Sequence, residues 1–137
     1  MKKWLAVLAC LLLTYTALAE QPAPTVYTEM DYSALISDPE AHRIEKYELS
    51  GTVYRAQKAQ ISISNWNNPH EMLLTCSNTP DQLIWVVGDC PADRDTIREG
   101  DVVHFIGSFQ TATEIKTASG EDVLIPFFVA GTLEIIN

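Results

Sequence analysis

The side chains most able to do chemistry are three histidines and three cysteines, and their spacing shows no catalytic pattern. His42, His70 and His104 lie far apart, and no two histidines or cysteines have the short spacing of metal ligands. No serine stands in a G-x-S-x-G motif, and no nucleophile has a recognisable base beside it. The sequence therefore predicts that the protein is not an enzyme and has no catalytic residue, no bound metal and no cofactor.

A cluster of acids is the strongest remaining candidate for chemistry, because neighbouring carboxylates can attract a cation. The cluster lacks the ligand spacing of an EF-hand loop, so a solvated loop between two strands is the simpler interpretation. Its members are Asp89, Asp93, Asp95, Glu99 and Asp101.

The first nineteen residues have the pattern of a secretory signal peptide. Lys2 and Lys3 form a positive start, residues 4–13 are apolar, and Ala17-Leu18-Ala19 is a cleavage motif. The apolar run is shorter than the ~20 residues that a membrane span needs. We expect cleavage after Ala19, which would release an exported bacterial protein that is periplasmic or secreted and has no membrane span.

Two cysteines, Cys76 and Cys90, are left when residues 1–19 are removed, because Cys10 lies in that segment. An even number of cysteines in an exported chain suggests a disulfide. We predict an intramolecular Cys76–Cys90 bond, which would stabilise the fold by ~3 kcal/mol. The pairing register of the two strands decides whether this bond can form. A tight hairpin after Cys76 would place this residue opposite Leu83, so the next strand would have to bend back for Cys90 to reach it.

The composition is acidic, with 18 aspartates and glutamates against 9 lysines and arginines and a formal net charge of −9. Such a charge opposes binding to nucleic acids and to anionic lipids. It suits solubility, or a basic protein partner. We expect the partner to be another envelope protein, a basic one included, and not a nucleic acid. The oligomeric state is left open.

The elements that must position these side chains are one short helix and five strands. Residues 20–29 contain two prolines and no periodic pattern, which predicts a flexible linker before a domain at 30–137. Tyr32, Leu35 and Ile36 recur at helical spacing, and Asp31 or Ser33 can cap their helix. We expect a helix within 30–42 and strands at 44–58, 71–76, 82–87, 102–116 and 123–135.

Glycines interrupt two of the predicted strands, Gly51 in the first and Gly107 in the fourth. A glycine inside a strand usually marks a bulge or a bend at the corner of a barrel. Together with the order of the elements, these bends predict a mainly β fold, a five-stranded OB-fold-like Greek-key barrel with a short N-terminal helix. The apolar face of the helix would plug one end of the barrel.

The sequence also resembles the tRNA-anticodon-binding-like OB-fold family, exported or membrane-anchored bacterial proteins of unknown function. The resemblance covers most of residues 31–136, apart from the inserted loop at 65–70 and the two cysteines. Because the shared motifs are turn and bend residues, they imply the fold and say little about activity. The motifs are Tyr32, Asp38-Pro39, Ser50-Gly51-Thr52-Val53, Glu99-Gly100-Asp101-Val102-Val103, Gly107-Ser108-Phe109, Ala118-Ser119-Gly120 and Ile125-Pro126.

OB barrels bind ligands on strands two and three and on adjoining loops. That region would contain Tyr54, Arg55, Trp66 and His70, which are the candidate ligand-binding residues. Aromatic rings there could stack on bases or sugars. Trp85 lies in an apolar strand, and we expect it to belong to the core.

Two functions fit these observations equally well. The first is a periplasmic binding or accessory module that acts through protein or small-ligand contacts. The second is a small periplasmic inhibitor or immunity protein that neutralises a basic toxin or enzyme. A third function, oligonucleotide or oligosaccharide binding, is allowed by the fold, but the scarcity of basic residues opposes its nucleic-acid form.

Overall fold

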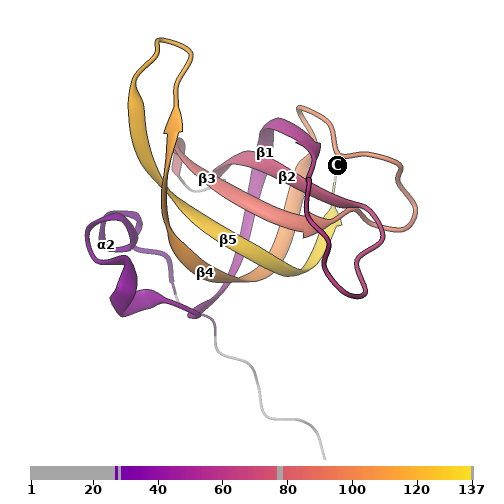
Figure 1. Cartoon of the computed structure of the whole chain (residues 1–137), viewed down its shortest axis with the longest axis horizontal. Helices are drawn as coiled ribbons and strands as arrows, with labels where there is room; N and C mark the ends of the chain where they lie inside the picture. Colours follow the sequence, from indigo (N-terminus) through magenta and orange to yellow (C-terminus); the bar gives the residue numbers. More distant parts are fainter. Residues whose placement is uncertain (1–26, 28, 77–78, 137) are drawn as a thin grey trace, which may run out of the picture.

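The computed structural model describes residues 27, 29–76 and 79–136 (Figure 1). The predicted signal peptide at 1–19 and most of the predicted linker at 20–29 lie outside the described residues, as do residues 77–78 of the predicted turn. Within the described part of the chain, no helix has both the length and the apolar character that crossing a membrane requires.

Five strands close into a barrel in the order β1-β2-β3-β5-β4, with β4 paired to β1. Neighbouring strands are antiparallel except β3 and β5, which are parallel. This order confirms the predicted fold, an OB-fold-like barrel after a short helix. The elements are α2 (Tyr32–Ser37), the 3-10 helix η1 (Pro39–His42), β1 (Lys46–Lys58), β2 (Pro69–Cys76), β3 (Thr79–Asp89), β4 (Val102–Lys116) and β5 (Asp122–Ile135).

Two of the strand glycines, Gly51 and Gly107, stand where neighbouring backbones approach too closely for a side chain. A Cβ atom added at Gly107 would lie 2.5 Å from the carbonyl oxygen of Val129, and one added at Gly51 would lie 2.6 Å from that of Thr75. The β4–β5 register also shifts between Ile106 and Gly107. The register skips one residue of β5 there, Gly131, so the bulge lies on β5 opposite Gly107. Contact with the backbone of β5 is the reason that glycine is needed at position 107.

Four aromatic rings form the centre of the core. The ring of Phe128 meets those of Tyr47, Phe105 and Phe109 edge to face, with centroids 5.5, 5.9 and 5.7 Å apart. This geometry adds to the energy of burying their area. All four rings are almost fully buried, so the inward faces of β1, β4 and β5 meet in one continuous core.

The predicted helix is divided in two at Asp38-Pro39. Asp31 caps α2, because its carboxylate accepts a hydrogen bond from the backbone N–H of Ala34 at 3.2 Å. Proline has no N–H to continue a helix, and it moves the preceding residue away from helical angles. Asp38 accordingly has φ −143°, and the chain resumes as the single turn η1.

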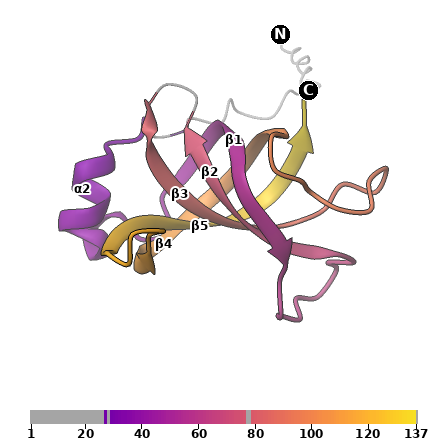
Figure 2. The same ribbon diagram turned by 90° about the horizontal axis from the view of Figure 1, so that it is seen from above.

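Helix α2 covers one end of the barrel, as predicted (Figure 2). Its Leu35 is buried in the core cluster. The pairing of β3 with β5 spans only residues 85–87 of β3, so the carbonyl group of Leu83 lies beyond it. The hydroxyl of Tyr32 donates a hydrogen bond to that carbonyl oxygen at 2.7 Å. The helix thus both fills the open end and satisfies a polar group at the edge of β3.

The predicted disulfide is wrong, because the two cysteines lie at opposite ends of β2. Cys76 is the last residue of that eight-residue strand. The N–H of Cys90 donates to the carbonyl of Asn68, just before β2 begins. At about 3.3 Å per residue, the strand separates the two by roughly 25 Å, whereas bridged cysteines have Cα atoms about 6 Å apart. Both side chains are buried thiols, and the antiparallel β3 does not bend back.

Candidate binding groove

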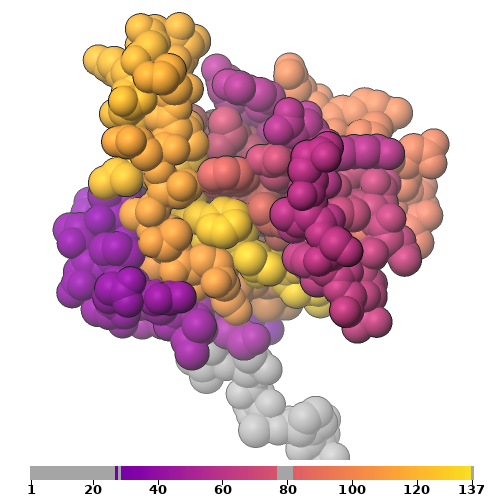
Figure 3. Space-filling view, in the orientation of Figure 1, coloured from indigo at the N-terminus to yellow at the C-terminus, as the bar shows by residue number. Residues whose placement is uncertain are grey.

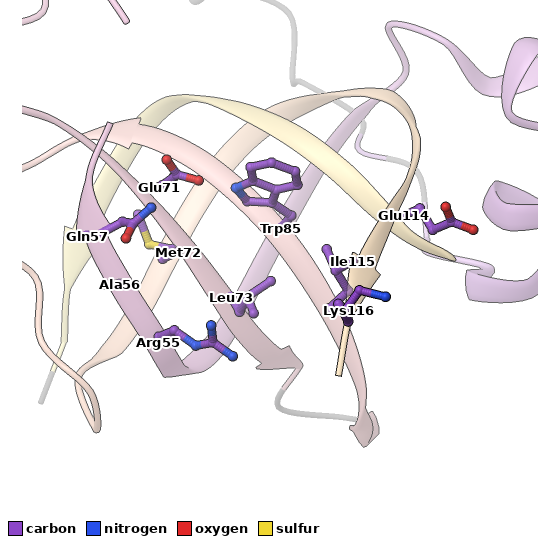
Figure 4. A pocket seen from close by; sticks show the side chains of 10 residues that line it. All are labelled: Arg55, Ala56, Gln57, Glu71, Met72, Leu73, Trp85, Glu114, Ile115 and Lys116. Carbon is purple, nitrogen blue, oxygen red and sulfur yellow. The ribbon is translucent and has the colours of Figure 1, made fainter. Parts of the chain in front are cut away.

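A groove of about 300 Å³ lies on the outer face of the barrel. Strands β1, β2 and β3 supply its floor, and the end of β4 in the β4–β5 hairpin supplies a wall. Figure 3 shows the hollow between the amber hairpin and the magenta end of β1, and Figure 4 shows the side chains. The lining residues are Arg55, Ala56, Gln57, Glu71, Met72, Leu73, Trp85, Glu114, Ile115 and Lys116.

The strand register puts one row of outward side chains along the floor. Leu73 of β2 pairs with Arg55 of β1 on one side and with Trp85 of β3 on the other. Trp85 pairs in turn with Phe127 of β5, and their ring centroids are 5.2 Å apart. The centre of the groove is therefore an apolar surface of leucine and indole, with a phenyl ring packed beside the indole.

A bulge in β1 is what brings Arg55 to the groove. Val53 is buried in the core, so strict alternation would turn Arg55 inward as well. The β1–β2 register shifts between these two residues, and Tyr54 becomes the extra residue. Arg55 then pairs with Leu73 on the outer face. Tyr54 is 53% exposed, and its ring centroid lies 6.0 Å from the guanidinium carbon of Arg55.

Trp85 was expected in the core, and the structure places it on the outer face. Its neighbours Ile84 and Val86 are fully buried, whereas Trp85 is half-buried. The strand alternates, but its outward residues Leu83, Trp85 and Val87 are also apolar, and of these Trp85 lines the groove. An unbroken apolar run therefore concealed the alternation. Leu73 could have been found from the clearer alternation of β2, in which every second residue is buried.

The charges that line the groove balance, although the chain as a whole is strongly acidic. Arg55 and Lys116 oppose Glu71 and Glu114. The ammonium of Lys116 pairs with Asp122 at 2.8 Å. Within the described part of the chain, no carboxylate lies at ion-pair distance from Arg55. In Figure 4, Arg55 lies beside Leu73, and Glu114 points away from Trp85.

The four predicted ligand-binding residues do not gather at one place. Arg55 lines the groove, and Tyr54 lies next to it. Trp66 borders a different hollow, over β4 and β5, together with Lys46 and Gly131. The loop that carries Trp66 is held at its base, because the carboxylate of Asp89 accepts hydrogen bonds from the backbone N–H groups of the two residues after Trp66, at 2.7–3.1 Å.

His70 is fully buried, which corrects its prediction as a ligand-binding residue. One ring nitrogen lies 3.0 Å from the carbonyl oxygen of Asn68, and the other lies 3.2 Å from the hydroxyl oxygen of Thr96. His70 thus connects β2 to the loop between β3 and β4. Position 70 is an inward position of β2, and that alternation was the signal that sequence reasoning passed over.

Two acids of the predicted cluster, Asp101 and Asp89, hold loops in position. Asp101 is 7% exposed and pairs with the guanidinium of Arg94 at 3.0 Å. It also accepts a hydrogen bond from the backbone N–H of Arg98 at 2.8 Å. Asp89 holds the loop before β2, as described above. Among the described residues, no group of three histidine, cysteine or acidic side chains is arranged to hold a metal ion.

Unlike His70, the other two histidines contact carboxylates. His42 lies 3.0 Å from Glu45. The two ring nitrogens of His104 lie 2.8 Å from Glu48 and 3.2 Å from Glu134, so this contact joins β1, β4 and β5 on the outer face.

Comparison of the sequence with protein-family models and with curated proteins finds no match. Membership of the tRNA-anticodon-binding-like family therefore stays a prediction. The groove itself is the basis for a functional proposal.

Proposed function

We propose that this domain is a non-catalytic binding module of the bacterial envelope, and that its groove takes a small ligand or a side chain of a partner protein. The observation that carries the proposal is the half-buried indole of Trp85, which lies on the outer face between Leu73 and Phe127. Small-ligand sites combine such an apolar surface with a few polar groups, and about 300 Å³ is the lower end of their usual volume.

The absence of catalysis is part of the proposal and is supported by the contacts of the histidines. Each of the three makes a hydrogen bond or ion pair within the fold. Burial raises the pKa of the Cys90 thiol, so its reactive thiolate form is disfavoured at neutral pH. Neither residue type lines the groove.

The place of action follows from the predicted signal peptide, and the kind of partner follows from the charge. An exported domain of this composition would meet small molecules and other envelope proteins. A net charge of −9 makes single-stranded nucleic acid a poor partner even though the groove lies where OB barrels bind it.

A fragment screen by NMR tests the proposal. We expect hits to shift the resonances of Leu73, Trp85 and Ile115 together, and we expect Trp85→Ser to abolish those shifts. Trp66→Ser is the matched control, because Trp66 is a tryptophan that borders a different hollow and does not line the groove. Hits that avoid the groove, or that bind Trp85→Ser equally well, would refute the proposed site.

The acidic surface supports a second candidate, an inhibitor that docks on a basic protein. Charge complementarity raises association rates and makes them depend on salt. In that case the partner would bind over a broad surface, and its affinity would be insensitive to Trp85→Ser.

A further inference from the structure

We infer that the groove recognises a carboxylate attached to an aromatic or branched apolar group, with the carboxylate on Arg55 and the apolar group on Trp85. This inference rests on the proposed binding function and names the ligand chemistry. It follows from three features of the groove: the surroundings of the Arg55 side chain, the charges that line the groove, and the order of the side chains across its floor.

Arg55 is an exposed cation that lines the groove. The β1 bulge and the pairing with Leu73 set its position, and the Tyr54 ring lies beside its guanidinium group. Among the described residues, no carboxylate is within ion-pair distance of it. A guanidinium group presents two parallel N–H donors that match a carboxylate. Next to an apolar floor, such a pair is less exposed to water than one on an open surface.

The local charge does not oppose an acid, although the chain as a whole is strongly acidic. The chain has twice as many acids as lysines and arginines, yet the groove is lined by two of each. Lys116 adds a second positive charge on the hairpin wall, although it shares its charge with Asp122. Repulsion from acids elsewhere on the surface is screened over about 8 Å at physiological salt, so it does not prevent an anion from binding here.

The order of groups across the floor gives the shape of the ligand. Arg55, Leu73 and Trp85 stand on three adjacent strands that are about 4.8 Å apart. The distance from Arg55 to Trp85 across the floor is then roughly two strand spacings. The arginine side chain covers part of that distance, and the ligand covers the rest between its carboxylate and its ring. An arylalkanoic acid has this span, and so does a peptide that ends in an apolar residue. Both sources present the same chemistry.

The experiment uses matched acids and amides on the mature protein. The free-acid arm compares 3-phenylpropanoate with 3-phenylpropanamide. The peptide arm compares acetyl-Ala-Ala-Phe with its C-terminal amide. The readout is the indole N–H resonance of Trp85, with that of Trp66 as internal reference and Trp66→Phe to assign the two. Arg55→Gln removes the charge, and Lys58→Gln is the control, since Lys58 is a cation of the same strand outside the groove.

We expect an acid to shift Trp85 at millimolar concentration or below, with the corresponding amide about tenfold weaker or more, as loss of one charge-assisted pair implies. Arg55→Gln should remove the preference, and Lys58→Gln should keep it. Whichever acid binds more tightly, 3-phenylpropanoate or the peptide, identifies the source of the ligand. Equal binding of acid and amide would overturn the inference and leave the proposed function standing. Failure of both acids to shift Trp85 would also overturn it, and the fragment screen would then decide separately whether the groove binds anything.

Discussion

Cys76 and Cys90 show how a correct sequence rule can lead to a wrong bond. Both are buried, and the register of β2 and β3 holds them at opposite ends of a strand. We predict that peptides containing either cysteine are alkylated completely in denaturant without a reducing agent. In the native protein Cys90 should react slowly, because burial raises its pKa. A peptide pair joined by a disulfide in the mass spectrum would contradict the structure.

Tyr47 is expected to make the protein sensitive to alkali. Burial, and then the hydrogen bond to Glu45 at 2.7 Å, raise the pKa of the Tyr47 hydroxyl above its ordinary value near 10. The folded state therefore holds this proton more tightly than the unfolded state. The resulting stability is complete below pH 10 and is lost as the pH rises toward the folded-state pKa.

Urea unfolding between pH 8 and pH 11 measures this effect. The free energy of unfolding should fall above pH 10 in the wild type and fall less steeply in Tyr47→Phe, which cannot ionise there. Tyr54→Phe, at an exposed side chain, should follow the wild type. Parallel curves for wild type and Tyr47→Phe would show that the buried hydroxyl does not cause the decline. Burial also raises the pKa of Tyr32, so part of the decline should persist in Tyr47→Phe.

At the scale of elements, two glycines of the β4–β5 hairpin provide a matched test of how closely the backbones of these strands approach. An added Cβ at Gly107 would meet the backbone of β5 at 2.5 Å, whereas one at Gly131 would have its nearest contact at 3.7 Å. Gly107→Ala should therefore cost more than ~1 kcal/mol of unfolding free energy, because two paired strands must separate. Gly131→Ala should be neutral or slightly stabilising, because alanine restricts the unfolded chain. Equal thermal midpoints would contradict this account of the close approach at Gly107.

The strands were predictable because alternation, β-branched residues and turn signals all agreed. The fourth strand was predicted to follow the turn at Glu99-Gly100-Asp101 and to run to about Lys116, and the structure has β4 at Val102–Lys116. The prediction was wrong about the direction in which a side chain points where both faces of a strand are apolar, as at Trp85. The groove could not be derived either, since it depends on pairing and on the bulge before Arg55, and both are tertiary features.

For the whole molecule, the net charge predicts which macromolecules it will avoid. We expect no binding of labelled single-stranded oligonucleotides at physiological salt, since affinity for phosphate chains depends on neutralising charge and releasing counterions. Arg55 and Lys58 are close in sequence, but the chain as a whole is acidic. A fluorescence titration against a cationic protein as comparison would measure this. Micromolar oligonucleotide binding that weakens steeply with salt would refute the charge argument and favour the nucleic-acid role of the fold.

The β4–β5 hairpin extends past the closed ring of strands and supplies the Ile115 and Lys116 wall of the groove (Figure 1). Its tip at 117–121 is exposed for the most part and contributes nothing to the core cluster. Insertions at such a tip cost little folding energy. Evolution could therefore lengthen or recharge this wall while the barrel stays unchanged, and related chains would diverge in ligand preference faster through this hairpin than through any core position.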